Sequence, residues 1–96
     1  MRQIKFRVLA SADMRGIAHY TRKRWREEQA AAYGANLRDQ IKSLREFPLR
    51  FAEFDGKYVG LRQMGCGHHM VFYLVTDDAI DIVRVLHQAM DFSERL

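Results

Sequence analysis

Residues 70–75 read Met-Val-Phe-Tyr-Leu-Val, and every one of these side chains is apolar or aromatic. A strand with this pattern is buried on both faces, which is typical of a strand in the middle of a sheet. Similar segments flank it, and the three predicted strands are Tyr58–Met64, His68–Val75 and Ile80–His87. The turns expected between them, residues 65–67 and 76–78, are short enough to join only antiparallel neighbours. The C-terminal half therefore predicts three consecutive antiparallel strands.

The N-terminal half predicts one strand and two helices. Residues 4–8 alternate between apolar and polar side chains, as in a half-buried strand. Ser11 is placed to cap a following helix, with Asp13 in its first turn. Two apolar stripes at helical spacing come next, and their directions around a single helix axis would differ by about 140°. We therefore expect a break near residues 26–29 that folds the segment into an antiparallel helical hairpin. The second helix is expected to end at Pro48. The stripes are Met14, Ile17, Ala18, Thr21 and Trp25, then Ala30, Tyr33, Leu37, Ile41 and Leu44.

Together these elements predict an α+β fold in the order β-αα-βββ, with the helical hairpin packed on a mainly antiparallel sheet. A chain of 96 residues is long enough for one hydrophobic core and too short for two. We therefore expect a single domain over residues 1–96. Residues 90–96 are expected to add a final helical turn.

Basic side chains are concentrated in the N-terminal half of the chain. The formal net charge is +4, yet residues 1–50 carry 12 basic and 5 acidic side chains, which gives +7. Residues 51–96 carry 4 basic and 7 acidic side chains, which gives −3. This asymmetry favours an anionic partner for the N-terminal half, either a nucleic acid or an acidic protein segment.

Composition also disfavours secreted and membrane proteins. Cys66 is the only cysteine, so there is no internal disulfide framework and a reducing compartment is favoured. The N-terminus carries Arg2, Lys5 and Arg7 and lacks the apolar core of a secretory signal. The longest strongly apolar run, residues 70–75, is far shorter than a membrane span. We expect a soluble, cytoplasmic protein that does not contact a membrane.

The densest positive charge is the segment Arg22-Lys23-Arg24-Trp25-Arg26. One interpretation is a patch that contacts phosphates, with the tryptophan as a stacking aromatic. The other is a solvated helix end, where cations are favoured by the helix dipole and the tryptophan belongs to the core. We favour the second interpretation, because Trp25 is in phase with the apolar stripe of the first helix.

Residues with catalytic or metal-binding chemistry are scattered rather than arranged in a motif. Cys66, His68 and His69 suggest a metal, but adjacent strand residues point to opposite faces and no spacing supplies further ligands. Groups suited to a nuclease are Lys57, Tyr58, Arg62, Arg84 and His87, all in the half with net negative charge. We expect no metal and no cofactor.

Several strings of residues carry more specific information. The first helix contains Ala12-Asp13-Met14, Ile17, Tyr20 and Trp25, and the second contains Gln29-Ala30, Tyr33, Leu37 and Leu44, followed by Pro48. Leu61-Arg62 precedes His69-Met70-Val71-Phe72-Tyr73, and the most specific string is Arg84-Val85-Leu86-His87-Gln88-Ala89-Met90-Asp91. In order and spacing these strings resemble the ParE branch of the ParE/RelE toxin superfamily, whose ending reads R-x-LH-x-x-MD.

The resemblance implies a toxin of a bacterial type II toxin–antitoxin module that poisons DNA gyrase without being an enzyme. It implies neutralisation by a ParD-like antitoxin, which wraps an extended and helical segment around the hairpin and the sheet. Promoter DNA would be bound only indirectly, through the antitoxin. An acidic antitoxin tail would complement the +7 of residues 1–50.

Two other functions stay open. The RelE branch cleaves messenger RNA on the ribosome with Lys, Arg and a C-terminal Tyr or His, and Arg62 matches one of its arginines. This chain has Gln88-Ala89 where RelE-type enzymes have an arginine, and its tail carries Phe92 without a Tyr or His. The loss of both groups disfavours RNA cleavage. The third function is a toxin fold that is no longer toxic and serves as an interaction module.

The resemblance also assigns candidate residues. The branch-specific ending and its surroundings are expected to act on the target, although packing and capping of the tail explain Met90 and Asp91 equally well. The exposed basic residues of the hairpin are expected to contact the antitoxin. The target-action candidates are Arg62, Arg84, His87, Met90 and Asp91, and the antitoxin-binding candidates are Arg22, Arg26, Arg38, Lys42 and Arg45.

Overall fold

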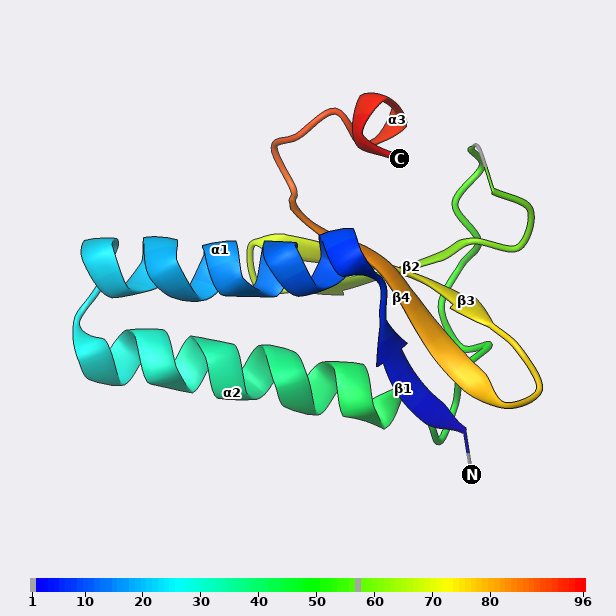
Figure 1. Cartoon of the computed structure of the whole chain (residues 1–96), viewed down its shortest axis with the longest axis horizontal. Coiled ribbons are helices and arrows are strands. Elements are labelled where there is room, and N and C mark those ends of the chain that lie inside the picture. Colours follow the sequence, from blue (N-terminus) through cyan, green and yellow to red (C-terminus); the bar gives the residue numbers. More distant parts are fainter. Residues whose placement is uncertain (1, 57) are drawn as a thin grey trace.

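A computed structural model describes residues 2–56 and 58–96, and it shows a four-stranded sheet with a helical hairpin on one face (Figure 1). The order of elements is the expected β-αα-βββ, followed by one short helix. They are β1 (Gln3–Phe6), α1 (Val8–Arg24), α2 (Glu27–Ser43), β2 (Arg62–Cys66), β3 (His69–Val75), β4 (Ala79–His87) and α3 (Phe92–Arg95).

The strand order in the sheet is β1-β4-β3-β2. β3, which contains the apolar run at residues 70–75, lies inside the sheet and pairs antiparallel with both β2 and β4. β1 joins the other side of β4 as a parallel strand, with Ile4 opposite Ile80. The predicted fold class, with a mainly antiparallel sheet, is confirmed.

The sheet buries side chains on both faces. On one face the helices cover Val71, Tyr73 and Ile82, and on the other Phe72 packs with Leu86 beneath the loop before β2 and the C-terminal tail. The pairing of β3 with β4 shifts by one residue between Phe72 and Tyr73, as in a β-bulge. Burial on both faces explains why this stretch of sequence lacks polar side chains.

The start of α1 differs from the expectation. Val8 was predicted to end the first strand and Ser11 to cap the helix, but α1 begins at Val8 with Arg7 as its N-cap residue. The backbone N–H of Ser11 already donates to the carbonyl of Arg7, which is a helical bond. Val8 is 83% exposed, because β1 pairs with β4 only as far as Phe6. Alternation of residue types could not show where this pairing stops.

The hairpin is confirmed, and its break lies slightly earlier than expected. α1 ends at Arg24 and α2 begins at Glu27, so Trp25 and Arg26 form the connection. Trp25 was expected in the core on the apolar face of α1, but it lies just after the helix and is partly exposed. α2 ends at Ser43, several residues before Pro48, because the chain leaves the helix through turns at residues 44–46. The final helical turn is also confirmed, as α3, and no helix in the described residues is long and apolar enough to cross a membrane.

The strand predicted over Tyr58–Met64 is shifted toward the C-terminus. β2 begins at Arg62, since Gly60 has a positive φ of 80° and turns the chain just before it. Cys66, expected in a turn, pairs with His69 and ends β2, so the turn consists of Gly67 and His68. His68 is therefore not a strand residue, and the argument that His68 and His69 point to opposite faces does not hold. Lys57 lies outside the described residues.

Candidate functional site: grooves beside the helical hairpin

Two adjoining grooves run between the helices of the hairpin. The distal groove, of about 260 Å³, lies toward the connection between the helices and includes Thr21, Arg22 and Glu27. The proximal groove, of about 420 Å³, lies toward β1 and includes Ile4, Phe6 and Ile41. Met14, Ala18 and Arg38 line both of them, so the two grooves adjoin, and we call them together the channel.

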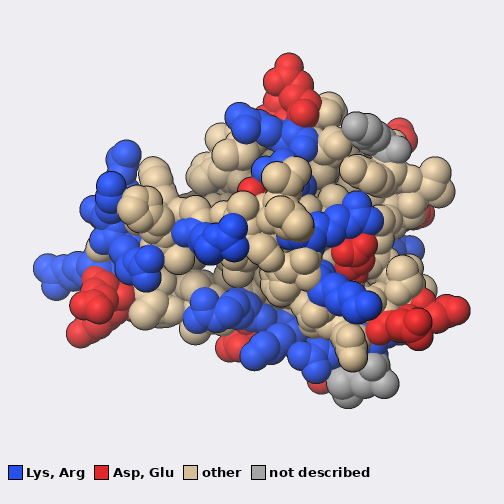
Figure 2. Space-filling view, in the orientation of Figure 1, with Lys and Arg blue, Asp and Glu red and all other residues tan. Residues whose placement is uncertain are grey.

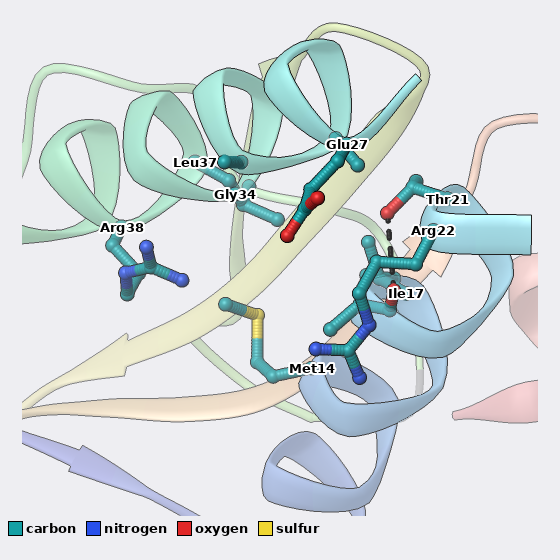
Figure 3. A pocket seen from close by; sticks show the side chains of 11 residues that line it. Met14, Ile17, Thr21, Arg22, Glu27, Gly34, Leu37 and Arg38 are labelled. Carbon is teal, nitrogen blue, oxygen red and sulfur yellow. Dashed lines mark hydrogen bonds between the residues drawn. The ribbon is translucent and has the colours of Figure 1, made fainter. Parts of the chain in front are cut away.

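The channel has an apolar floor and a basic rim. Figure 2 shows Lys and Arg side chains gathered over the hairpin on this face of the molecule. Arg15 and Arg22 border it from α1, while Arg38, Lys42 and Arg45 border it from α2 and the turn that follows. Glu27 is the one acidic side chain among the residues that line either groove. Figure 3 shows the distal groove, lined by Met14, Ile17, Thr21 and Arg22 of α1 and by Glu27, Gly34, Leu37 and Arg38 of α2.

The structure brings four of the five antitoxin-binding candidates to this channel. Arg22 and Arg38 line the distal groove, and Arg38, Lys42 and Arg45 line the proximal one. Arg26 instead occupies the N-cap position of α2, at the end of the hairpin. Arg15 belongs to the channel but was not predicted. Arg15 lies one helical turn after Ser11 and one before Ala18, and both of these residues line the proximal groove. This spacing is the signal that could have identified Arg15.

A third groove lies between α1 and the end of β4. We call it the tail groove, and its volume is about 490 Å³. It is mostly apolar, with Gly16 and Tyr20 on the α1 side and His69, His87 and Met90 on the side of the sheet and tail. Tyr20 is 54% exposed and Met90 is 40% exposed, so both side chains are accessible to a partner. Two of the target-action candidates, His87 and Met90, therefore meet here.

The other target-action candidates hold the fold together. Arg84 makes a bidentate ion pair with Asp13, with Nε to Oδ2 at 2.7 Å and Nη2 to Oδ1 at 2.9 Å. The hydrogen bond to Asp13 raises the pKa of Arg84. The backbone N–H of Val85 donates to the same carboxylate at 2.9 Å, and Arg84 also donates to the carbonyl of Arg95. Asp13 thus links α1 to β4, rather than opposing the helix dipole as expected.

Arg62 and Asp91 are also engaged within the chain. Arg62 Nη1 donates to the carbonyls of Leu49 and Phe51, at 3.3 and 2.6 Å. The Asp91 side chain accepts a hydrogen bond from the backbone N–H of Ser93 and caps α3. Arg62 therefore fixes the loop before β2, away from the residues of the tail groove.

Three histidines and two aromatic residues cluster at the β2–β3 turn. The ring of His87 lies 5.4 Å from that of His69 and 6.3 Å from that of His68. Tyr33 of α2 reaches the same turn, where its hydroxyl lies 2.5 Å from His69 Nδ1 and accepts from the backbone N–H of His68 at 3.0 Å. Trp25 packs edge-on against Tyr33 with 5.1 Å between the ring centroids. This cluster docks the far end of the hairpin onto the sheet.

The cluster keeps His69 neutral at pH 7. Burial, followed by the neighbouring His87 and His68, lowers the pKa of His69 to about 4. Burial raises the pKa of Tyr33, so its hydroxyl keeps its proton beside the neutral imidazole, to which it is hydrogen-bonded at Nδ1. In the described residues, no group of three His, Cys, Asp or Glu side chains is placed to hold a metal ion.

Comparison with known proteins identifies the family. Residues 4–92 match the sequence model described as ParE toxin of type II toxin–antitoxin system, parDE. The chain is 38% identical to Toxin ParE1 of Caulobacter vibrioides over 82 residues, which cover 85% of this chain and 84% of that protein. It is 36% identical to Toxin ParE of Escherichia coli over 88 residues, which cover 91% of this chain and 85% of that protein.

Solved structures agree on the fold. The chain resembles one described as a chromosomal ParDE TA system from P. aeruginosa, with a TM-score of 0.77, 20% identity, and coverage of 91% of this chain and 96% of that one. It also resembles the YoeB dimer from Staphylococcus aureus, with a TM-score of 0.66, 15% identity, and coverage of 91% and 97%. The match to the family over nearly the whole chain and the identity to its members lead to one conclusion: this chain belongs to the ParE toxin family of type II toxin–antitoxin systems.

Proposed function

We propose that this chain is a cytoplasmic toxin that inhibits DNA gyrase by binding it and is neutralised by a ParD-like antitoxin seated in the hairpin channel. The observation that carries the antitoxin part is the basic channel itself. Its apolar floor, with Met14 and Ile41, suits the apolar side of an amphipathic segment. Its rim, with Arg15, Arg38 and Lys42, suits carboxylates on the same segment.

The tail groove is the proposed contact with the target. It contains His87 and Met90 from the branch-specific ending, and the one described residue that it shares with the lining of the channel is Ile17. Arg84 and Asp91 would act on this groove indirectly. Arg84 of β4 is hydrogen-bonded to Asp13 of α1 and to the carbonyl of Arg95 in the tail, and Asp91 caps α3. We propose these two as positioning residues.

Non-catalytic action is favoured over RNA cleavage by the state of the candidate groups. Arg62 and Arg84, which a nuclease would need for the phosphate, are engaged in hydrogen bonds within the chain. His87, the candidate histidine, accepts a hydrogen bond at Nδ1 from the backbone N–H of Ala89 at 3.1 Å. These are the observations that support a toxin acting without catalysis.

The test is a supercoiling assay with purified gyrase, relaxed plasmid, ATP and excess toxin. The proposal expects loss of supercoiling or accumulation of cleaved plasmid, and prior addition of the antitoxin should restore activity. A Met90→Lys variant should lose inhibition while still binding the antitoxin, because it alters only the tail groove. Unimpaired supercoiling at excess toxin would contradict the gyrase assignment.

Two further readouts separate the alternatives. Cleavage of messenger RNA in a reconstituted translation reaction would support the RelE-type function. Normal growth of cells that express the chain without its antitoxin would support a non-toxic interaction module. Growth arrest with intact messenger RNA is the expected outcome.

A further inference from the structure

One end of the molecule carries an accessible group of aromatic and basic side chains that the hairpin channel does not use. It lies where α1 passes into α2, next to the turn between β2 and β3, at the left of Figure 1. We call this group the tip surface and define it by Lys23, Arg24, Trp25, Arg26 and His68. Trp25 is partly exposed and the other four are exposed.

Flat rings form the base of the tip surface. The rings of Tyr33 and His68 are nearly parallel, at 19° and 6.3 Å between centroids, and those of His68 and His87 are also nearly parallel, at 11° and 6.3 Å. Trp25 stands at a steep angle beside this row, 6.3 Å from His68. Because His68 is exposed and Trp25 partly so, part of this aromatic group is accessible to a ligand.

The rings are held in place by the backbone around them. Gly67 has a positive φ of 58°, and a Cβ there would lie 2.6 Å from the Tyr33 ring. The Tyr33 hydroxyl accepts from the backbone N–H of His68 at 3.0 Å and so fixes the turn that presents this histidine. A ligand would therefore meet a platform that needs little ordering on binding.

Cations flank Trp25 along the chain. Lys23, Arg24 and Arg26 are its exposed neighbours, and Figure 2 shows basic side chains, with acidic ones beside them, projecting from this end of the hairpin. The guanidinium of Arg24 lies 4.8 Å from the centre of the Tyr20 ring, which extends the aromatic surface toward the tail groove. Of the two acidic residues that follow, Glu27 is directed into the distal groove (Figure 3).

We propose that the tip surface binds an unpaired strand of DNA, with bases stacked on Trp25 and His68 and phosphates paired with Lys23, Arg24 and Arg26. Exposed rings next to exposed cations are the combination by which proteins bind single strands, because every base has a stacking face and every nucleotide a negative charge. The carboxylates of an acidic peptide would pair with the cations but offer no flat face to stack on the rings. The choice of DNA over RNA rests on the proposed function, since gyrase acts on DNA.

Trp25 reports its own binding, because it is the only tryptophan in the chain. The experiment is titration of the toxin with an oligothymidylate of about twelve nucleotides in about 50 mM salt, while the tryptophan emission is followed. We expect saturable quenching that weakens at least tenfold in about 200 mM salt. An abasic strand of the same length should bind more weakly and quench less, because it offers phosphates without bases.

Two variants and a matched control test the residues. Lys23→Glu with Arg24→Glu should weaken oligothymidylate binding at least tenfold, and His68→Ala should weaken it severalfold without affecting the abasic strand. Arg38→Glu with Lys42→Glu makes the same change of charge in the channel and should have a much smaller effect. Far-ultraviolet circular dichroism of each variant checks that the fold is kept.

Several results would overturn the proposal. Absence of quenching at low salt would do so, as would equal binding of the abasic strand or equal loss in the channel variant. Tighter binding of oligouridylate than of oligothymidylate would replace DNA with RNA as the ligand. Quenching by an acidic antitoxin peptide but by neither oligonucleotide would make the tip part of the protein interface. None of these measurements uses gyrase, so a negative result would reject DNA binding at the tip surface and leave the proposed inhibition of gyrase untouched.

Discussion

At the level of single residues, the contact between Asp13 and Arg84 matters most for the arrangement of helices and sheet. Both side chains are 15% exposed, and the carboxylate accepts from the guanidinium and from the backbone N–H of Val85. This carboxylate accepts three hydrogen bonds at a largely buried position, so removing it leaves those donors without partners. The sequence alone suggested a different role for each of these residues.

We predict that Asp13→Ala lowers the free energy of unfolding by about 2 to 4 kcal/mol, because it leaves Arg84 and the Val85 N–H without their acceptor. Urea unfolding followed by circular dichroism measures this change. Asp81→Ala is the matched control, since its pair with Arg7 is more exposed, at 25% and 41%. An exposed pair contributes only about 0 to 1 kcal/mol. Equal losses in the two variants would contradict a special role for Asp13.

His69 gives a prediction about pH. Its pKa is about 4 in the folded chain and near its ordinary value of 6.5 in the unfolded chain. Between these values the unfolded chain binds more protons, so stability is complete above about pH 6.5 and falls as the pH drops toward 4. We expect His69 to account for a loss of about 1 kcal/mol between pH 7 and pH 5 after allowance for partial exposure.

The measurement is the midpoint of urea unfolding at pH 7 and pH 5 in the parent chain and in His69→Gln. The glutamine amide can form a hydrogen bond with the Tyr33 hydroxyl, and it does not titrate. The drop in midpoint should be smaller in the variant, while the contribution of carboxylates is shared by both proteins. A drop of the same size in both would show that another group is responsible.

At the level of elements, the turn between β2 and β3 depends on one glycine. Gly67 has a φ of 58°, and a Cβ there would lie 2.6 Å from the Tyr33 ring that docks the hairpin. Gly60 also has a positive φ, of 80°, but a Cβ there would meet nothing within 4 Å. An alanine at position 60 would therefore add backbone strain alone, whereas an alanine at position 67 would add both strain and a steric clash.

We predict that Gly67→Ala destabilises the fold by about 2 to 3 kcal/mol and Gly60→Ala by about 1 kcal/mol, since only the first adds a clash to the strain. Thermal unfolding of the two variants provides the comparison. Gly67→Ala should also change the tryptophan emission, because Tyr33 packs against Trp25. If Gly60→Ala proved the more harmful of the two, the contact with Tyr33 would not be what requires a glycine at position 67.

At the level of the whole molecule, charge is divided between surfaces. The basic channel lies between α1 and α2, whereas the tail groove on the other side of α1 has no lysine or arginine among its lining residues. α1 thus separates a surface suited to an acidic segment from one suited to an apolar contact. This separation would allow the two surfaces to be changed independently.

We predict that Arg38→Glu with Lys42→Glu weakens binding of the ParD-like antitoxin by about ten- to a hundredfold at low salt, since two attractive contacts become repulsive. Isothermal titration calorimetry at two salt concentrations measures the effect, which should shrink as salt rises. Lys23→Glu with Arg24→Glu is the control with the same change of charge. An unchanged affinity in the channel variant would mean that its basic rim is only solvated.

The elements and their order follow from local patterns in the sequence. The apolar run at residues 70–75 predicted an interior strand because burial on both faces excludes polar side chains, and the phase change between the two stripes predicted the hairpin. The ending at residues 84–91 identified the family, which the comparisons confirm. These properties are local in the chain, so periodicity and residue type were enough to reveal them.

The contacts of the polar side chains, by contrast, depend on how the elements pack together. Asp13 and Arg84 are separated by 71 positions and meet only because α1 packs on β4. Arg62 and His69 likewise have their partners in other elements, the loop before β2 and the helix α2. Hydrogen bonds and pKa values depend on distances across the fold, which no local pattern records. The division of the hairpin's basic residues between the channel and the tip surface likewise depends on how the two helices pack against each other.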